Sequence, residues 1–244
     1  MYIKYYFIAA DVEDVHWWFR GRRAILKSAI DSFFQVTGQP KDIFEIGCGN
    51  GGNLPLLANY GKLFAVEMND AALKRSASRG IAQIEKGYLP DSLPFDDKAF
   101  DLVAAFDVIE HIDDDLKSIQ VIHARLNPNG LLVLTVPAYN MLWSPHDELS
   151  HHKRRYTSAQ IISVIETAGF KVLYKSYFNT LLFPLAVLNI LLSRIFKSYS
   201  CFALKLPPSI INSIFTSVFS FESRILSKFS LPFGMSIVVC AQRK

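Results

Sequence analysis

The stretch Phe44-Glu45-Ile46-Gly47-Cys48-Gly49-Asn50-Gly51-Gly52-Asn53 decides the fold of this 244-residue chain. An apolar run over residues 41–46 is typical of a buried strand, and it leads directly into a glycine-rich turn. Glycine adopts positive φ angles and lets a ligand approach the backbone closely. We therefore expect a strand, a tight turn that binds a nucleoside-bearing cofactor, and a helix that opens near Asn53. The Glu45 carboxylate at the strand tip suits a cationic ligand.

The glycine spacing alone leaves two cofactors open. Gly47, Gly49 and Gly52 satisfy the dinucleotide fingerprint G-x-G-x-x-G. Glu45, Gly47, Gly49 and Gly51 equally satisfy E-x-G-x-G-x-G, which resembles motif I of the class I S-adenosylmethionine (SAM) methyltransferases. In both families a carboxylate about 20 residues further on binds the ribose hydroxyls, and Glu67 has that position.

Later segments favour the methyltransferases. Residues 92–112 read SLPFDDKAFDLVAAFDVIEHI and resemble that family's L-P-F-x-D-x-x-F-D-x-V block followed by D-V-x-E-H. Residues 126–137, LNPNGLLVLTVP, resemble its L-x-P-G-G-x-L turn and fifth strand, with Asn129 where a glycine is usual. Together with the segments H-W-W-F-R (16–20), H-K-R-R-Y-T (152–157) and L-P-F-G-M-S (231–236), the chain resembles one subgroup of class I methyltransferases whose acceptors are unassigned. The resemblance thus points to the cofactor more clearly than to the acceptor.

Alternating strands and helices predict a parallel α/β sheet with ligands beyond the carboxyl ends of its strands. The resemblance implies a single domain with a Rossmann-like seven-stranded sheet, an antiparallel last strand and helices on both faces. We expect a helical cap (1–40), a SAM-binding core (41–177), an apolar helical insertion (178–234) and a final strand (235–244). Because the sixth strand ends and the seventh begins at the carboxyl edge, the insertion should emerge beside the active site.

Periodicity and turn signals also predict the individual elements. The expected strands are 42–46, 62–67, 82–85, 100–106, 131–136, 170–177 and 235–241. The expected helices are 12–36, one from 53, one from 70, 113–126 and 157–169.

The net charge of +4 conceals an asymmetry. Residues 177–244 carry seven Lys or Arg and one acid, Glu222. The preceding residues therefore have a slightly negative net charge, which argues against a basic nucleic-acid-binding surface there. A basic, apolar C-terminal part fits an anionic membrane surface. Its apolar run from Leu181 contains Asn189 and Arg194 and is shorter than the roughly 20 residues that span a bilayer. The second stretch, 210–229, suits a lid or interfacial helix, and core or homodimer packing is the alternative.

Cysteine usage and the N-terminus bear on the compartment. Cys48, Cys201 and Cys240 are scattered, which indicates neither a disulfide framework nor a zinc site. Residues 1–10 lack a basic leader and a clear cleavage site, so we expect no signal peptide. We predict a cytoplasmic protein, peripheral at the inner face of the membrane.

The resemblance assigns roles to individual residues on the cofactor side. It implies that Glu45 meets the methionyl amino group, that Glu67 holds the ribose and that Met68 packs on the adenine. An acidic residue common near Leu89 is absent, and Asp91 is the candidate substitute. The residues expected at SAM, or at its product S-adenosylhomocysteine, are Glu45, Gly47, Cys48, Gly49, Gly51, Asn53, Glu67, Met68, Leu89, Phe106, Asp107 and His111.

The acceptor side is predicted from residue chemistry. Methyl transfer from a sulfonium needs alignment and water exclusion, and a hydroxyl nucleophile benefits from a base. His146 with Asp147, or His152, could supply that base, although each could instead clamp the loop structurally. The segment Arg154-Arg155-Tyr156 could bind an acceptor phosphate or sulfate, or it could equally be a solvated basic face. The expected acceptor-binding residues are Trp17, Trp18, Tyr139, Trp143, Arg154, Arg155 and Tyr156. A His-carboxylate metal site has no geometry that the sequence specifies, and we predict no metal.

These observations together predict SAM-dependent methyl transfer to a small acceptor, most simply at oxygen. An apolar insertion beside the pocket favours a hydrophobic or lipid-linked molecule, such as a polyprenyl-linked sugar or a quinone-like compound. Two alternatives stay open, an NAD(P)-dependent oxidoreductase and a non-catalytic SAM-binding, membrane-associated module.

Overall fold

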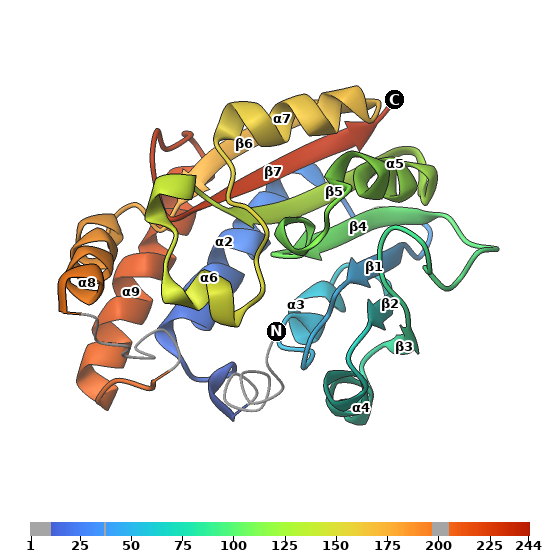
Figure 1. Ribbon diagram of the computed structural model, residues 1–244. Coiled ribbons are helices and arrows are strands. Elements are labelled where there is room, and N and C mark those ends of the chain that lie inside the picture. Colours follow the sequence, from blue (N-terminus) through green and yellow to red (C-terminus); the bar gives the residue numbers. More distant parts are fainter. Residues whose placement is uncertain (1–10, 37, 197–204) are drawn as a thin grey trace.

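The computed structural model describes residues 11–36, 38–196 and 205–244 and contains one seven-stranded sheet (Figure 1). Residues 1–10 of the predicted cap and 197–204 of the predicted insertion, with Cys201, lie outside the described residues. The strand order is β3-β2-β1-β4-β5-β7-β6. Strands β1 to β5 are parallel, and β7 runs antiparallel to both β5 and β6, which confirms the predicted sheet. The strands are β1 (Asp42–Ile46), β2 (Lys62–Glu67), β3 (Gln83–Lys86), β4 (Phe100–Phe106), β5 (Leu126–Pro137), β6 (Phe170–Phe178) and β7 (Ser236–Arg243).

The helices cover both faces of the sheet, and each face has its own hydrophobic core. One core joins the sheet to α5 and α7, and the other joins it to α2, α3 and α9. Apart from the one-turn 3₁₀ helices Ile109–His111 and Asn140–Leu142, the helices are α2 (Trp17–Phe33), α3 (Leu54–Leu57), α4 (Asp70–Ser78), α5 (Asp115–Ala124), α6 (Pro145–Leu149), α7 (Ser158–Thr167), α8 (Phe183–Phe196) and α9 (Ser209–Leu226).

Most predicted boundaries agree with the structure to within a few residues. The N-terminal helix begins only at Trp17, because the His16 side chain accepts a hydrogen bond from the Trp18 amide and caps it. Strand β5 begins earlier than expected, since Leu126 already pairs with Phe100 of β4. Thr157 caps α7 as predicted, through a capping box with Gln160.

The insertion leaves the sheet and returns to it at a narrow neck. Phe178 at the end of β6 pairs with Ser236 at the start of β7. Buried Glu222 of α9 accepts hydrogen bonds of 2.7 Å from the amides of Asn179 and Leu181, so the start of the insertion is tied to its second helix. None of the helices among the described residues is both long enough and apolar enough to cross a membrane.

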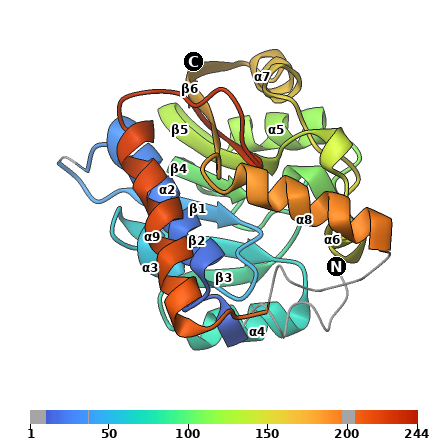
Figure 2. The ribbon, with the colours of Figure 1, turned by 90° about the vertical axis from the view of Figure 1, so that its left-hand side faces the viewer.

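Helix α9 packs along α2, far away in sequence (Figure 2). Phe219 of α9 is fully buried and stacks on Phe178. A β-carbon at Gly21 of α2 would lie only 2.3 Å from the Phe219 ring, so glycine is required for this approach. The second half of the insertion is therefore part of the domain's core rather than a detached appendage.

Candidate functional site

A cavity of about 1790 Å³ lies at the carboxyl edge of the sheet. Its wall joins the glycine turn after β1 and the ends of β2 and β4 to α2, the loop around α6, and α8. Small-molecule sites usually occupy roughly 300–1,000 Å³. This cavity can therefore hold a nucleoside cofactor and a second molecule at the same time. The expectation that the insertion lies beside the site agrees with this geometry.

The glycine turn has the backbone that its sequence predicts. Gly47, Gly49 and Gly51 have φ angles of 70°, 56° and 86°, a region that side chains with a β-carbon rarely adopt. The amides of Gly47 and Cys48 both donate to the Val66 carbonyl, at 2.9 and 3.1 Å, and fix the turn against β2. The turn consequently exposes its backbone to the cavity.

Glu67 holds the second side of this turn. Its Oε2 accepts a hydrogen bond from the Gly49 amide at 2.9 Å, and its Oε1 accepts one from the Asn69 amide at 2.8 Å. Burial raises the pKa of Glu67, while these amide bonds oppose that rise. Met68 follows at the rim with 63% of its surface exposed, where a planar base could cover it.

Glu45 lies just beneath the cavity wall. Its side chain is fully buried, and Asn53 Nδ2 donates to its Oε1 at 3.1 Å. The other oxygen has no hydrogen-bond partner among the described residues. Burial raises the pKa of Glu45 to about 8. A buried carboxylate with an unsatisfied oxygen is costly, so the arrangement fits a cationic group that arrives with a ligand.

An ion pair joins α2 to the tip of β4. Asp107, with a φ angle of 55°, pairs with Arg22 at 3.0 Å and accepts a hydrogen bond from Thr135. The Arg22 guanidinium also lies over the rings of Trp18 and Phe106, 5.0 and 5.8 Å from their centres. The same N-terminal segment also contains Arg20 and Arg23. Trp18 and Arg22 are four residues apart and therefore lie on one face of α2.

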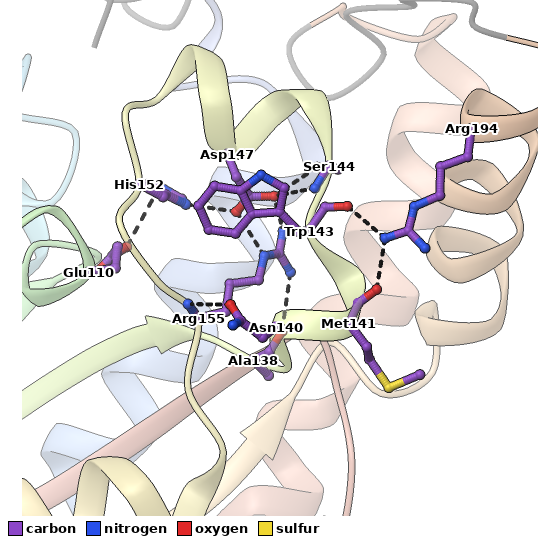
Figure 3. Close-up of polar contacts among 10 residues, drawn as sticks. All are labelled: Glu110, Ala138, Asn140, Met141, Trp143, Ser144, Asp147, His152, Arg155 and Arg194. Atoms are coloured by element: carbon purple, nitrogen blue, oxygen red, sulfur yellow. Dashed lines mark hydrogen bonds and ion pairs between the residues drawn. The ribbon is translucent and has the colours of Figure 1, made fainter.

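Asp147 is the centre of a buried network on the opposite wall (Figure 3). Arg155 donates to its two oxygens at 2.7 and 2.8 Å, and His152 Nδ1 lies 2.8 Å from Oδ1. The Ser144 amide and hydroxyl also donate to it, at 2.7 and 2.9 Å. Burial alone would raise the pKa of Asp147, but the bonds from His152 and Arg155 hold it well below its usual value. The carboxylate is therefore charged near pH 7, and it holds the His152 ring by the contact to Nδ1.

Glu110 lies beyond His152, as Figure 3 shows, in the 3₁₀ turn after β4. It is fully buried, and neither of its carboxylate oxygens has a hydrogen bond from the described residues. Within ion-pairing distance of it lies His152, whose Nε2 is 3.9 Å from Glu110 Oε1. The ring of His111 lies 4.7 Å from that of His152, and all three side chains line the cavity. Glu110 belongs to the D-V-x-E-H pattern, but that pattern alone does not indicate that it is a site residue.

Comparison with known proteins now decides the cofactor. The profile of the family described as "Methyltransferase domain" matches residues 18–175. The chain belongs to this family. It is a class I SAM-dependent methyltransferase domain, and the dinucleotide interpretation of the glycine turn is excluded by this match.

Curated relatives of the methyltransferase domain are distant. This chain is 28% identical over 137 residues to a probable SAM-dependent methyltransferase of Mycolicibacterium smegmatis. The match covers 54% of this chain and 52% of that protein. The chain is 26% identical over 165 residues to another of Mycobacterium tuberculosis (strain ATCC 25618 / H37Rv), covering 66% and 58%. The chain thus spans about half the length of the curated relatives it matches.

Solved structures confirm the fold of the methyltransferase domain. A putative sarcosine dimethylglycine methyltransferase from Galdieria sulphuraria superposes with a TM-score of 0.61 at 14% identity, covering 91% of this chain and 86% of that one. At such identity the likeness establishes the architecture and leaves the acceptor undetermined.

The predicted anion site of the methyltransferase domain needs correction. Arg155 lines the cavity, but its guanidinium donates to both Asp147 oxygens and to the Ala138 carbonyl. Arg154 pairs with Asp115 of α5 at 3.0 Å. The Tyr156 hydroxyl donates to the same Asp115 carboxylate. These side chains clamp the loop to the sheet because their donors are already paired with carboxylates, which argues against a phosphate or sulfate site here.

Other acceptor-side predictions separate into two groups. Trp17, Trp18 and His146 line the large cavity. Tyr139 instead stacks on Tyr177 and borders a separate cavity of about 240 Å³, and the Trp143 carbonyl accepts a hydrogen bond from Arg194 of α8. These two aromatic residues therefore support the wall and are not placed to contact an acceptor.

The structure also differs from the predicted pairing of His146 with Asp147. Asp147 makes its hydrogen bond to the imidazole of His152, and the His146 ring lies 6.1 Å from the His152 ring. Burial lowers the pKa of His146 to about 4, so its imidazole is neutral near pH 7. Sequence spacing favoured the adjacent pair, but adjacent residues on a helix point in different directions.

Proposed function

We propose that this domain transfers the methyl group of SAM to an oxygen of a small hydrophobic or lipid-linked acceptor. The observation that carries the proposal is the single cavity that runs from the glycine turn to the apolar helices of the insertion. A polar, backbone-rich end suits the cofactor, and an apolar end suits a hydrocarbon chain. The acceptor's reactive oxygen would lie between them, near His146 and His152.

The cofactor end accommodates SAM through the residues described above. Glu67 would bind the ribose hydroxyls and Met68 and Leu89 would enclose the adenine. Glu45 would balance the methionyl amino group through Asn53 or a water. The remaining contacts would come from Gly47, Cys48, Gly49, Phe106 and Asp107, with His111 at the boundary to the acceptor. Gly51, also expected at the cofactor, does not line the cavity and instead faces Leu54 and Arg79.

The acceptor end is formed by one face of α8 and part of α9. Leu185 and Leu188 of α8 line the cavity together with Leu182, which precedes this helix, and Ile211 and Phe215 of α9. Leu185 and Leu188 are each about half exposed, at 50% and 52%. An apolar chain could therefore enter from the surface and pass along this wall, with burial stabilising it by about 0.8 kcal/mol per methylene group.

The same helices also offer a surface for an anionic membrane. Exposed apolar side chains outside the cavity include Leu191, Ile210 and Ile214, with 46%, 74% and 53% of their surface exposed. The surrounding charge is positive, since Glu222, the one acid of this part of the sequence, is buried. We therefore keep the predicted peripheral membrane association as part of the proposal. A homodimer through these side chains is the competing arrangement, and ultracentrifugation distinguishes it from vesicle binding.

The decisive test is transfer of label from methyl-labelled SAM into an organic-extractable product, with a membrane lipid extract as the acceptor source. Label in a lipid product that Glu67→Ala lowers, at a SAM concentration below saturation, supports the proposal. Binding of S-adenosylhomocysteine without any label transfer would instead support a non-catalytic SAM-binding module.

A matched pair of double variants tests the apolar wall. Leu185→Asp with Leu188→Asp introduces charge inside the cavity, and Ile210→Asp with Ile214→Asp introduces the same charge outside it. We expect the first pair to lower lipid methylation at least tenfold with unchanged S-adenosylhomocysteine binding. The second pair should lower vesicle binding alone. Equal activity of the cavity variant and the wild type contradicts the acceptor assignment.

A further inference from the structure

We propose that Glu110, His111 and His152 bind a divalent transition-metal ion at the acceptor side of the cavity. One carboxylate oxygen and one ring nitrogen from each histidine lie within 4.8 Å of one another. All three residues line the same cavity as the glycine turn. The first two come from the turn after β4, and the third comes from the loop after α6.

The buried Glu110 carboxylate is the strongest sign of a ligand. Its side chain has no exposed surface, and both oxygens are without hydrogen bonds from the described part of the chain. Buried carboxylates are ordinarily paired or coordinate a metal, because an isolated charge in a protein interior is very unfavourable. The approach of 3.9 Å to His152 Nε2 is too long for a hydrogen bond and leaves space between the two atoms.

The outer contacts of both histidines suit metal ligation. His152 Nδ1 is held by Asp147, which Arg155 and Ser144 hold in turn, so Nε2 is the nitrogen that faces Glu110. His111 Nδ1 lies 3.4 Å from the His151 carbonyl. Metal-binding histidines characteristically bond a carboxylate or a backbone carbonyl through the nitrogen that does not ligate. Asp147 is accordingly a positioning residue for this site.

The donor set indicates the class of metal. Two imidazoles with one carboxylate suit Zn²⁺, Fe²⁺ and related ions, whereas Mg²⁺ and Ca²⁺ prefer oxygen ligands. Three protein ligands leave coordination positions for another molecule. The site departs from the sequence-based prediction of no metal, because His152 is remote from His111 in the chain and forms no recognised motif with it.

The role of the ion rests on the function proposed above. A divalent cation beside an acceptor hydroxyl lowers the pKa of that hydroxyl. The hydroxyl proton would be released to solvent. The oxygen then attacks the methyl carbon, the sulfur–methyl bond breaks as the oxygen–methyl bond forms, and S-adenosylhomocysteine leaves. The reaction needs no oxidant or reductant.

The test is calorimetric titration of chelator-treated, dialysed protein with Zn²⁺. We expect one Zn²⁺ per wild-type chain, and at least tenfold weaker binding in Glu110→Gln, His111→Gln and His152→Gln. His123→Gln is the matched control, because it removes an imidazole that packs on Phe170 of β6 instead of lining the cavity. Its affinity for Zn²⁺ should stay within twofold of the wild type.

Two results would overturn the site. One is wild-type binding no tighter than that of a Glu110→Gln/His111→Gln/His152→Gln triple variant, and the other is unchanged affinity in all three single variants. If a variant fails to fold by circular dichroism, X-ray absorption of Zn²⁺-loaded wild type decides instead. Two imidazole nitrogens at about 2.0–2.1 Å support the site, and a shell without imidazole refutes it.

Titration with S-adenosylhomocysteine on the same samples separates this site from the methyltransferase proposal. If the protein binds Zn²⁺ but not S-adenosylhomocysteine, the metal site is supported and its proposed role in methyl transfer is contradicted. The opposite result is a triple variant that cannot bind Zn²⁺ but still binds S-adenosylhomocysteine and methylates lipid as the wild type does. That result would support the proposed function and show that the ion has no part in it.

Discussion

The two ends of the cavity are built in different ways. At the cofactor end, the glycine turn and Glu67 come from adjacent parallel strands, and backbone amides form most of the surface. At the acceptor end, a network of side chains joins Glu110, Asp147 and His152, and its outer wall comes from α8 and α9. A fixed ligand can be recognised by a local backbone pattern, whereas a variable one is recognised by side chains that only tertiary packing brings together.

The largest effect is expected where the acceptor end is anchored. Phe219→Ala removes a fully buried ring between α2 and the sheet, and the cavity left behind should lower the free energy of unfolding by about 3–5 kcal/mol. Urea denaturation measures the change. Phe221→Ala, on the same helix but 49% exposed, is the control and should stay within about 0.5 kcal/mol. Equal losses in both variants would show that α9 is not an anchor.

Removing the Glu67 carboxylate, which is proposed to bind the ribose, tests the cofactor end. Glu67→Ala should weaken S-adenosylhomocysteine binding by about 1–3 kcal/mol, the scale of hydrogen bonds to a charged group. Part of that loss would arise because the Gly49 amide loses its acceptor. The exposed Glu85 of β3 offers a matched change, Glu85→Ala, which should leave binding unaltered. Calorimetry that finds both variants equal to wild type contradicts the ribose role.

Proton linkage tests the part assigned to Glu45. With a pKa of about 8, this carboxyl is mainly protonated at pH 7 in the free domain. Binding of an ammonium group favours the ionised form, so binding releases up to about one proton, and affinity for S-adenosylhomocysteine should rise up to about tenfold from pH 6 to 7. The rise should level off above about pH 8, where Glu45 is already ionised in the free domain.

Calorimetry in two buffers of different ionisation enthalpy counts the protons released. Methylthioadenosine, which lacks the amino-acid part, is the control and should release none. Equal proton release by both ligands would remove Glu45 from recognition of the amino group.

The smallest effect concerns the loop where the sequence departs from its family. Asp91 lines the cavity but also pairs with Lys117 at 2.7 Å, and both side chains are more than half exposed. If Asp91 accepts a hydrogen bond from the adenine amino group, Asp91→Ala weakens S-adenosylhomocysteine binding by about 0.5–1.5 kcal/mol. Lys117→Ala breaks the same surface pair and should leave binding unchanged. A loss shared by both variants would assign the effect to the ion pair.

The sequence indicates the backbone geometry of the glycine turn more directly than the side-chain contacts at the other end of the cavity. The residues of the glycine turn and Glu67 act through local backbone geometry, which their spacing encodes directly. Arg155 and Tyr156 were misassigned because their partners, Asp147 and Asp115, are chosen by tertiary contacts. Glu110 was missed because burial and the absence of hydrogen bonds, both properties of the fold, distinguish it from an ordinary acid.

The neck between Phe178 and Ser236 allows the insertion to vary without disturbing the sheet, because the ladder pairs the two residues directly. Each doubling of loop length adds only about 0.6 kcal/mol of closure entropy, and roughly four doublings separate a short hairpin from residues 178–234. Burial of one phenylalanine such as Phe219 can offset much of that cost. Lineages could therefore replace this segment as a unit and acquire a new acceptor while the machinery for SAM stays the same.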